Sequence, residues 1–304
     1  MTKHPPRAPR NGVAIIALSS LFFGAMAVTT RLLAGQVPAA EIVTVRFVVG
    51  AVGCVLGFLW LRRWPNLKQW RLLLGRGAFG GLAVLTYFFA IERLGAAPAT
   101  VLNYSSPIYA AVFAAWFLRE SSTWVKRLGL GLATVGAALV TLSSTNGVSG
   151  PSSWVPDPGA IAGVISAVLG GAAMTSIRRL RDDTDALTIF FAFCVVGALV
   201  SGPVAAPGWV PLEGRAGWIC LAVGLLSIGG QLLFTWGMGF TTATVGSATT
   251  QLVPFVAWVL SVAWLHEGIS ALGTIGAACT VVGVMLGVVQ RAPALEATGA
   301  SRGV

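Results

Sequence analysis

The sequence predicts an all-α integral membrane protein of ten transmembrane helices, built as two inverted five-helix repeats around a central cavity. Three observations lead to this prediction. The 304 residues are 56% hydrophobic and only 10% charged, whereas soluble domains carry about 25% charged residues. The apolar residues form runs near the roughly 20 residues that cross a bilayer. Residues of the same type also recur 147 positions apart along the chain.

Ten apolar runs of suitable length are separated by short connections. The expected spans are residues 12–33, 39–61, 70–91, 97–118, 125–144, 159–178, 186–205, 216–238, 243–265 and 270–289. The first span follows a basic tail, is too long for a signal-peptide core and lacks an obvious cleavage site, so we expect it to be retained. The longest connection, residues 145–158, is rich in Gly, Ser and Pro. It separates a first repeat, residues 12–144, from a second, residues 159–291.

Lys and Arg residues predict the orientation. If the N-terminus is inside, sixteen of the twenty cations fall on the cytoplasmic side, including five assigned to the connection after the second span: Arg62, Arg63, Lys68, Arg71 and Arg76. Cytoplasmic loops of membrane proteins are enriched in Lys and Arg. We therefore expect a multi-pass protein of the bacterial inner membrane with both termini in the cytoplasm and linker 145–158 in the periplasm. Cations spread over short loops argue against nucleic-acid binding, which uses a continuous basic face.

A constant offset of 147 relates the two halves. Pro107 and Glu120 in the first half correspond to Pro254 and Glu267 in the second. Further pairs at this offset are Gly12 and Gly159, Ser19 and Ser166, Gly24 and Gly171, Arg31 and Arg178, Leu118 and Leu265, Gly129 and Gly276, and Gly136 and Gly283. Because each repeat has an odd number of spans, the repeats must have opposite orientations. Inverted repeats are common in transporters, whose substrate sites lie near the midplane at the repeat interface.

The duplicated Pro-x12-Glu motif (Pro107 to Glu120, Pro254 to Glu267), together with five-plus-five spans, resembles the drug/metabolite transporter superfamily. Within it the sequence is most similar to the EamA-type bacterial exporters, including the branch that moves amino acids and aromatic amino acids. The similarity covers all ten spans. It implies a basket-like bundle in which spans one to four and six to nine enclose the cavity. It also implies transport of amino acids, other small metabolites or toxic organic cations.

Polar and aromatic side chains inside the spans are the candidate substrate-binding residues: Tyr87, Asn103, Tyr104, Gln231, Gln251, Trp258 and Arg46. Amide and phenol groups could bind the polar end of an amphipathic substrate, and an indole face could bind a ring or a cation. Arg46 could attract a carboxylate. The alternatives are ordinary interhelical hydrogen bonds and, for Arg46, a snorkelling side chain or a structural ion pair.

Pro107 and Pro254 are candidate hinges, with static kinks as the alternative. Glu120 and Glu267 are expected to cap helix N-termini. Since no carboxylate lies mid-span and no GxxxxGK[ST] loop is present, facilitated or exchange transport is favoured over proton-coupled or ATP-driven transport.

The predicted function is export of small amphipathic metabolites, most of all amino acids, by alternating access. One alternative is a proton-coupled exporter of toxic organic cations or drugs. Another is a polytopic membrane enzyme acting on lipids. The one acidic cluster in the sequence, Asp182 to Asp185, adjoins arginines, so a solvated loop network explains it more simply than an active site. A channel would need a ring of like charges. With two histidines and no clustered cysteines, no metal or cofactor is expected. We expect a monomer, with a dimer through the Gly283–Gly287 pair as the alternative.

Overall fold

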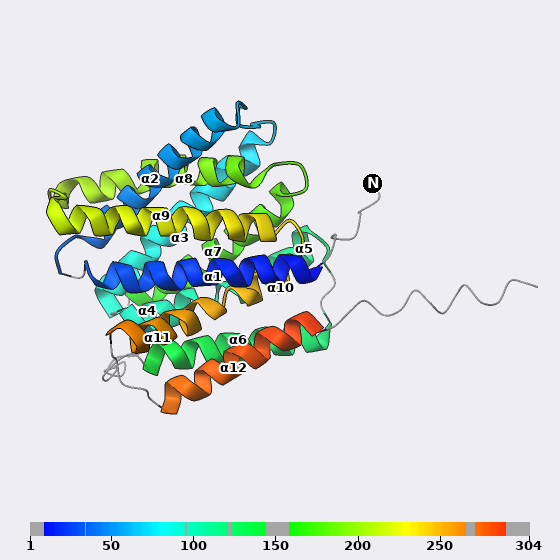
Figure 1. Cartoon of the computed structure of the whole chain (residues 1–304). Helices are drawn as coiled ribbons and strands as arrows, with labels where there is room; N and C mark the ends of the chain where they lie inside the picture. The colour runs from blue at the N-terminus through cyan, green and yellow to red at the C-terminus, as the bar shows by residue number, and fades with distance from the viewer. Residues whose placement is uncertain are drawn as a thin grey trace, which may run out of the picture.

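The computed structural model describes residues 9–33, 35–94, 96–120, 123–143, 158–265 and 271–289. The linker before Pro158, and Glu267, therefore lie outside the described residues. All regular elements in these ranges are helical (Figure 1). They are α1 (Pro9–Arg31), α2 (Ala39–Trp60), α3 (Trp70–Leu94), α4 (Ala96–Asn103), α5 (Ser106–Phe117), α6 (Trp124–Ser143), α7 (Pro158–Leu180), α8 (Ala186–Ala205), a 3-10 turn (Ala206–Gly208), α9 (Gly214–Gly237), α10 (Ala243–Thr249), α11 (Leu252–Leu265) and α12 (Ala271–Val289).

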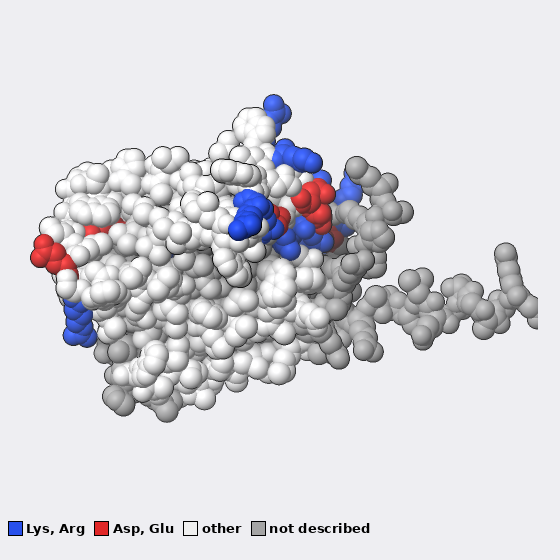
Figure 2. All heavy atoms as spheres, turned by 45° about the horizontal axis from the view of Figure 1, so that its top comes forward, with Lys and Arg blue, Asp and Glu red and all other residues white. Residues whose placement is uncertain are grey.

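Seven described segments are long and apolar enough to cross a membrane: α1, α2, α3, α7, α8, α9 and the segment Ala243–Trp264 that holds α10 and α11. Helices α5 and α12 are shorter apolar helices. Figure 2 shows charged side chains at the two ends of the bundle and an uncharged band between them. Leu56, Leu59 and Leu199 are 60%, 66% and 70% exposed. Such an apolar outer surface is the one that faces lipid.

The two halves of the chain pack against each other instead of forming separate bodies. Helix α1 lies between α9 and α11, α3 packs on α7, and α2 packs on α8 (Figure 1). Helices α6 and α12 lie side by side at one edge of the bundle. Three of the four cysteines, Cys54, Cys194 and Cys220, are buried and free, and each belongs to an apolar cluster between helices of both halves.

The expected fourth and ninth spans are each broken into two helices. Helix α4 ends at Asn103 and α5 begins at Ser106, while α10 ends at Thr249 and α11 begins at Leu252. Pro107 is the second residue of α5, a position where the missing N–H costs no intrahelical bond. Each of these two expected spans is therefore interrupted, and each proline stands near the start of the second helix.

Arg76 also departs from the prediction. It was assigned to a cytoplasmic connection, but it lies in the second turn of α3, inside the apolar segment Trp70–Ala90, and is only 4% exposed. Arg76 therefore has to be removed from the count of loop cations that was used to predict the orientation. The expected third span, residues 70–91, already contains position 76, so the span prediction and the count of loop cations disagree at this residue.

Helices α6 and α12 make matched contacts at glycines. A Cβ at Gly136 would overlap the backbone nitrogen of Thr280, and a Cβ at Gly283 would overlap the backbone nitrogen of Ala133. Adding 147 to one pair gives the other pair. Absence of a side chain lets the two backbones approach closely, as small residues do in membrane helix pairs.

A second matched set joins the other helices. A Cβ at Gly24 on α1 would lie 2.9 Å from Cβ of Val256 on α11, and one at Gly171 on α7 would lie 2.7 Å from Cβ of Tyr109 on α5. These two contacts are also related by the offset of 147. The repeat therefore specifies equivalent helix contacts and not only similar composition.

Candidate functional site

The breaks in the two discontinuous helices are joined by a hydrogen bond. Gln251 follows the end of α10 and is fully buried. Its Nε2 donates to the backbone oxygen of Tyr104 at 2.8 Å and to Oγ1 of Thr134 at 3.0 Å. Tyr104 and Gln251 are 147 residues apart, so two equivalent positions of the repeat bond to each other. Breaks in membrane helices expose backbone groups that need such partners.

Gln251 also carries an unused acceptor. Its Oε1 is buried and has no hydrogen-bond partner within the described residues. An unpaired buried amide oxygen is costly. The atom is therefore placed to accept a hydrogen bond from a bound molecule or from water.

Asn103 continues the polar cluster into the neighbouring helices. Its Nδ2 donates to Oγ of Ser166 at 2.7 Å, and that hydroxyl donates to the backbone oxygen of Ala83 at 2.8 Å. The chain of bonds ties the end of α4 to α7 and α3. Because Ser166 is fully buried, this arrangement fixes the position of the break between α4 and α5.

Tyr87 lies close to the same cluster. Its hydroxyl shares a 2.7 Å hydrogen bond with Oγ1 of Thr100, one turn before the end of α4. Its ring packs against Ala90, Ala99 and Ala162. Tyr87 therefore holds α4 against α3, which matches the interhelical alternative to substrate binding.

Gln231 and Trp258 are half-buried on α9 and α11. Oε1 of Gln231 is buried without a hydrogen-bond partner in the part of the chain that the structure describes. No hydrogen bond between described residues joins either side chain to Tyr104 or Asn103. The structure thus brings Tyr104 and Gln251 together, while Gln231 remains a separate free acceptor.

Arg46 stands apart from the other predicted residues. Its guanidinium carbon lies 5.0 Å from the ring centre of Phe47. Glu41 forms no ion pair with it among the described residues: Oε2 of Glu41 accepts the backbone N–H of Val210 at 2.9 Å, and Oε1 has no hydrogen-bond partner there. Within the described ranges no ion pair satisfies Arg46, so the ion-pair alternative finds no support in this structure.

Glu120 caps a helix, but not the one nearest in sequence. Both carboxylate oxygens accept the backbone N–H of Ala243 at 3.0 Å, at the first residue of α10, and Nε of Arg178 lies 3.9 Å from Oε1. The side chain thus connects the end of α5 to α7 and α10. Burial raises the pKa of the Glu120 carboxyl, while the Ala243 hydrogen bond and the Arg178 charge oppose the rise.

Glu120→Gln is expected to remove a pH dependence of stability. The raised pKa lets the folded protein keep a proton on Glu120 that the unfolded chain loses near pH 4.5. The free energy of unfolding of the wild type therefore falls relative to that of the variant as the pH rises from 4.5 through the raised pKa. Above the raised pKa the difference between the two proteins is constant. Unfolding midpoints of both proteins across this pH range measure it. The exposed Glu213→Gln is the control. A difference that is flat, or that grows in favour of wild type with rising pH, would contradict the expectation.

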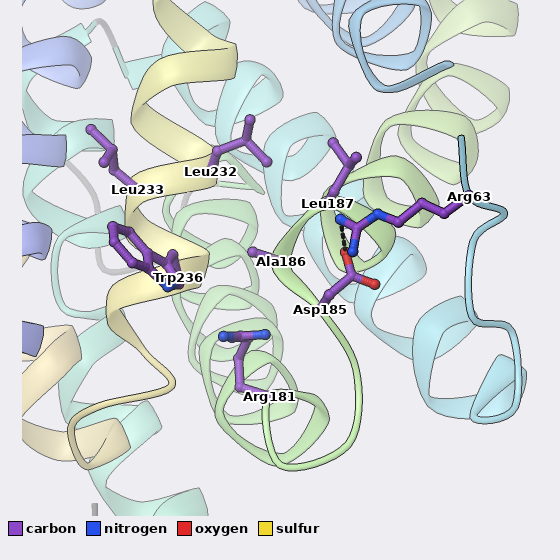
Figure 3. A pocket seen from close by; sticks show the side chains of 8 residues that line it. All are labelled: Arg63, Arg181, Asp185, Ala186, Leu187, Leu232, Leu233 and Trp236. Atoms are coloured by element: carbon purple, nitrogen blue, oxygen red, sulfur yellow. Dashed lines mark hydrogen bonds and ion pairs between the residues drawn. The ribbon is translucent and has the colours of Figure 1, made fainter. Parts of the chain in front are cut away.

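A cavity of about 390 Å³ lies between the start of α8 and the end of α9 (Figure 3). Asp185 pairs with Arg63 at 3.3 Å and accepts the backbone N–H of Thr188. Burial lowers the pKa of Arg181, and the nearby Asp185 opposes this shift. None of the seven predicted residues lines this cavity. Its lining residues are Arg63, Arg181, Asp185, Ala186, Leu187, Leu232, Leu233 and Trp236.

The described residues contain no group of three or more His, Cys, Asp or Glu side chains that could bind a metal ion. The acidic run after α7 is an exposed ion-pair network. Asp182 pairs with Arg178 at 2.7 Å and with Arg179 at 3.3 Å, and Asp183 lies 3.6 Å from Arg179.

The family model for the EamA-like transporter family matches the chain twice, over residues 10–142 and 157–289. The chain belongs to the EamA-like transporter family. The resemblance inferred from the duplicated motif is thereby confirmed. An EamA-like chain is a transporter rather than an enzyme, and it is a multi-pass membrane protein.

Two relatives of this EamA-like transporter are exporters. The pseudopaline exporter CntI of Pseudomonas aeruginosa (strain UCBPP-PA14) is 29% identical over 247 residues, covering 80% of this chain and 84% of the relative. The "Probable terminal-alkyne amino-acid exporter" of Streptantibioticus cattleyicolor is 29% identical over 244 residues, covering 78% of each chain. A solved crystal structure aligns with a TM-score of 0.77 at 18% identity, covering 91% of this chain and 96% of that chain. At this identity it shows a shared fold.

Three polar residues of this EamA-like transporter escaped the sequence prediction: Thr134, Ser166 and Arg76. For Ser166 a signal was present, since it repeats Ser19 at the offset of 147. Thr134 is one of several hydroxyl residues in its span and has no distinguishing pattern. Arg76 follows the loop cations closely in the sequence and was counted with them.

Proposed function

We propose that this EamA-like transporter exports small amphipathic metabolites, most of all amino acids and aromatic amino acids among them, by alternating access. The names of the two exporter relatives support a small metabolite as cargo. The observation on which the mechanism rests is the hydrogen bond from Gln251 to the backbone of Tyr104. It links two helix breaks that come from equivalent positions of the two halves.

Ten spans in two inverted five-helix repeats, residues 12–144 and 159–291, remain part of this proposal. The glycine contacts of α6 with α12, and of α1 with α11 and α7 with α5, support it because they are related by the offset of 147. Each half could then adopt the conformation of the other, which produces inward-open and outward-open states. Pro107 and Pro254, near the starts of α5 and α11, are the proposed hinges.

The proposed substrate contacts use the free polar atoms near the breaks. Oε1 of Gln251 and Oε1 of Gln231 lack partners in the described structure and could accept hydrogen bonds from an ammonium group. Trp258 would face the apolar part of the substrate. Asn103 and Tyr87 act in this proposal mainly by positioning α4, since both already have hydrogen-bond partners.

Facilitated or exchange transport is proposed because Glu41 and Glu120 lie near helix ends and not in the middle of a span, where a proton-coupling carboxylate would be expected. Glu41 is at the start of α2 with one oxygen bound to the Val210 N–H, and Glu120 lies beyond the end of α5. The end of the bundle that carries most charged side chains (Figure 2) would face the cytoplasm of the inner membrane. The active form in this proposal is a monomer.

Flux through proteoliposomes tests the proposal. Purified protein would be reconstituted into liposomes, and these would be loaded with labelled amino acids, organic cations, sugars or nucleosides. Protein-free liposomes loaded in the same way are the control. Saturable efflux of amino acids, accelerated by unlabelled amino acid outside, is expected. Repeating the assay with an imposed pH gradient separates the modes of coupling. Efflux of organic cations alone, driven by the pH gradient, would favour the drug-export alternative and overturn the proposal.

A further inference from the structure

Two arginines lie inside the apolar bundle without an ion-pair partner among the described residues. Arg76 on α3 is 4% exposed, and its Nε and Nη1 have no hydrogen-bond partner in the part of the chain that the structure describes. Arg46 on α2 is half-buried, with Nε buried and also unpartnered. No ion pair among the described residues includes either side chain. Both lie within segments long and apolar enough to cross the membrane.

The two guanidinium groups occupy one constellation between α2, α3 and α8. Arg76 stacks over the ring of Phe193 at 4.0 Å, and Arg46 lies 5.0 Å from the ring of Phe47. These rings pack edge to face with centroids 4.9 Å apart. The two guanidinium groups therefore flank one edge-to-face pair of aromatic rings. Like charges placed together in an apolar surrounding require a strong compensating interaction.

Gly80 provides the space for one of them. A Cβ at this position would overlap Nη1 of Arg76 and would lie 2.6 Å from Cε2 of Phe193. Residue 80 is one turn after Arg76 on the same face of α3. The absence of a side chain there lets the guanidinium lie between α3 and α8 instead of extending toward water.

Acidic residues of the surrounding helices do not compensate these charges. Helix α8 has no acidic residue. Helix α2 has Glu41, of which one carboxylate oxygen accepts the Val210 N–H and the other has no hydrogen-bond partner among the described residues, and the sequence of α3 has Glu92, sixteen positions after Arg76. That separation is about 24 Å along a helix. Stacking on aromatic rings offsets only part of the cost of removing a guanidinium from water. No acidic side chain forms an ion pair with either arginine within the described ranges, and a bound anion would supply the missing compensation.

We propose that Arg46 and Arg76 form a carboxylate-binding site between the two halves, which takes the acid group of the transported solute. The inference rests on the proposed export of amino acids and names the residues that select for the acid. Arginine binds carboxylates through paired N–H groups with defined geometry. Phe47 and Phe193 add an apolar wall. Helices α2 and α3 come from the first half and α8 from the second, so relative movement of the halves would open and close the site.

Matched acid and amine probes test the site. Thermal unfolding of the purified protein would be followed with phenylalanine and phenethylamine, and with leucine and isoamylamine, pairs that differ only in the carboxylate. Wild type is expected to be stabilised by at least one acid and not by its amine. Sodium chloride and sodium phosphate at matched ionic strength distinguish a resident inorganic anion from a substrate carboxylate. Equal stabilisation by an inorganic anion or by the amine, or no stabilisation by any probe, would overturn the proposal.

Substitutions locate the effect. Arg76→Met and Arg46→Met keep the apolar stem and are expected to weaken acid binding at least about 30-fold. Arg71→Met, at an exposed arginine in the first turn of α3, should bind as wild type. Should Arg76→Met fail to fold, Arg76→Lys keeps the charge without the paired N–H geometry and should bind more weakly than wild type. Unchanged acid binding in the folded Arg46 and Arg76 variants would contradict the assignment.

Gly80→Ala tests the geometry while both charges remain. It is expected to displace the Arg76 guanidinium and weaken acid binding, whereas Gly131→Ala, with nothing within 4 Å of its Cβ, should bind the acid as wild type does. Flux assays separate the two proposals. Acid binding lost in the arginine variants, without amino-acid flux in wild type, would leave the site standing and refute export. Amino-acid flux that keeps its preference for acids over amines in Arg76→Met would refute the site and leave export standing.

Discussion

Gln251→Leu is expected to reduce transport at least about tenfold, with folded protein still recovered. Leucine removes both donors, so the Tyr104 carbonyl and the Thr134 hydroxyl lose the partner that holds the two helix breaks together. Interhelical hydrogen bonds in membranes contribute about 0.6 kcal/mol on average, and an unpaired buried carbonyl costs about 1–3 kcal/mol. The fold tolerates such a loss more easily than a site whose geometry must be held within a fraction of an ångström.

Proteoliposome efflux, normalised to correctly folded protein by size-exclusion chromatography and unfolding midpoint, measures the effect. Gln36→Leu is the matched control, since Gln36 is exposed and its side-chain amide donates to the backbone oxygen of Leu32, one turn earlier in the chain. Gln251→Glu is informative as well, because it keeps the size of the side chain but replaces the amide nitrogen, which donates both hydrogen bonds, with a carboxylate oxygen. Wild-type efflux in Gln251→Leu would show that the bond between the breaks is structural packing without a role in transport.

Helix limits were accessible to sequence reasoning because apolar runs are long and their ends coincide with charged or turn-forming residues. The expected second span, 39–61, corresponds to Ala39–Trp60, and the expected seventh, 186–205, to Ala186–Ala205. The helix breaks were not accessible. A proline in an apolar run fits a kinked helix as well as a helix start, and the choice depends on a partner for the freed backbone groups. That partner is Gln251, 147 residues from Tyr104.

The candidate site shows a similar limit. Tyr104 was selected for its phenol, yet the interaction that joins the breaks uses its backbone oxygen, and side-chain patterns do not reveal backbone roles. Glu120 was expected to cap a helix, but its partner, Ala243, is 123 residues away. Arg76 follows loop cations in the sequence and was grouped with them, although the structure buries it. In each case the residue type was informative and the partner was decided by tertiary packing.

Packing of α6 on α12 yields a prediction in which neighbouring glycines respond with opposite signs. In an exposed helix interior, Gly→Ala stabilises by about 1 kcal/mol, because glycine loses more backbone entropy on folding. Gly131 faces open space, so Gly131→Ala should raise the free energy of unfolding. At Gly283 a new Cβ would meet the backbone of Ala133 and lie 2.7 Å from the backbone oxygen of Gly129. Backbone atoms cannot yield by changing rotamer.

We therefore expect Gly283→Ala to lower the free energy of unfolding by about 1–3 kcal/mol, the usual cost of overpacking. Gly136→Ala should match it, because its Cβ would meet the equivalent backbone of α12. Unfolding in mixed micelles measures all three variants, with each midpoint compared with that of wild type. The double variant should lose less than the sum of the two, since either alanine alone already separates the helices. Stabilisation by Gly283→Ala similar to that by Gly131→Ala would show that α6 and α12 do not pack through these glycines, and the contact equivalence that supports the repeat would lose its strongest example.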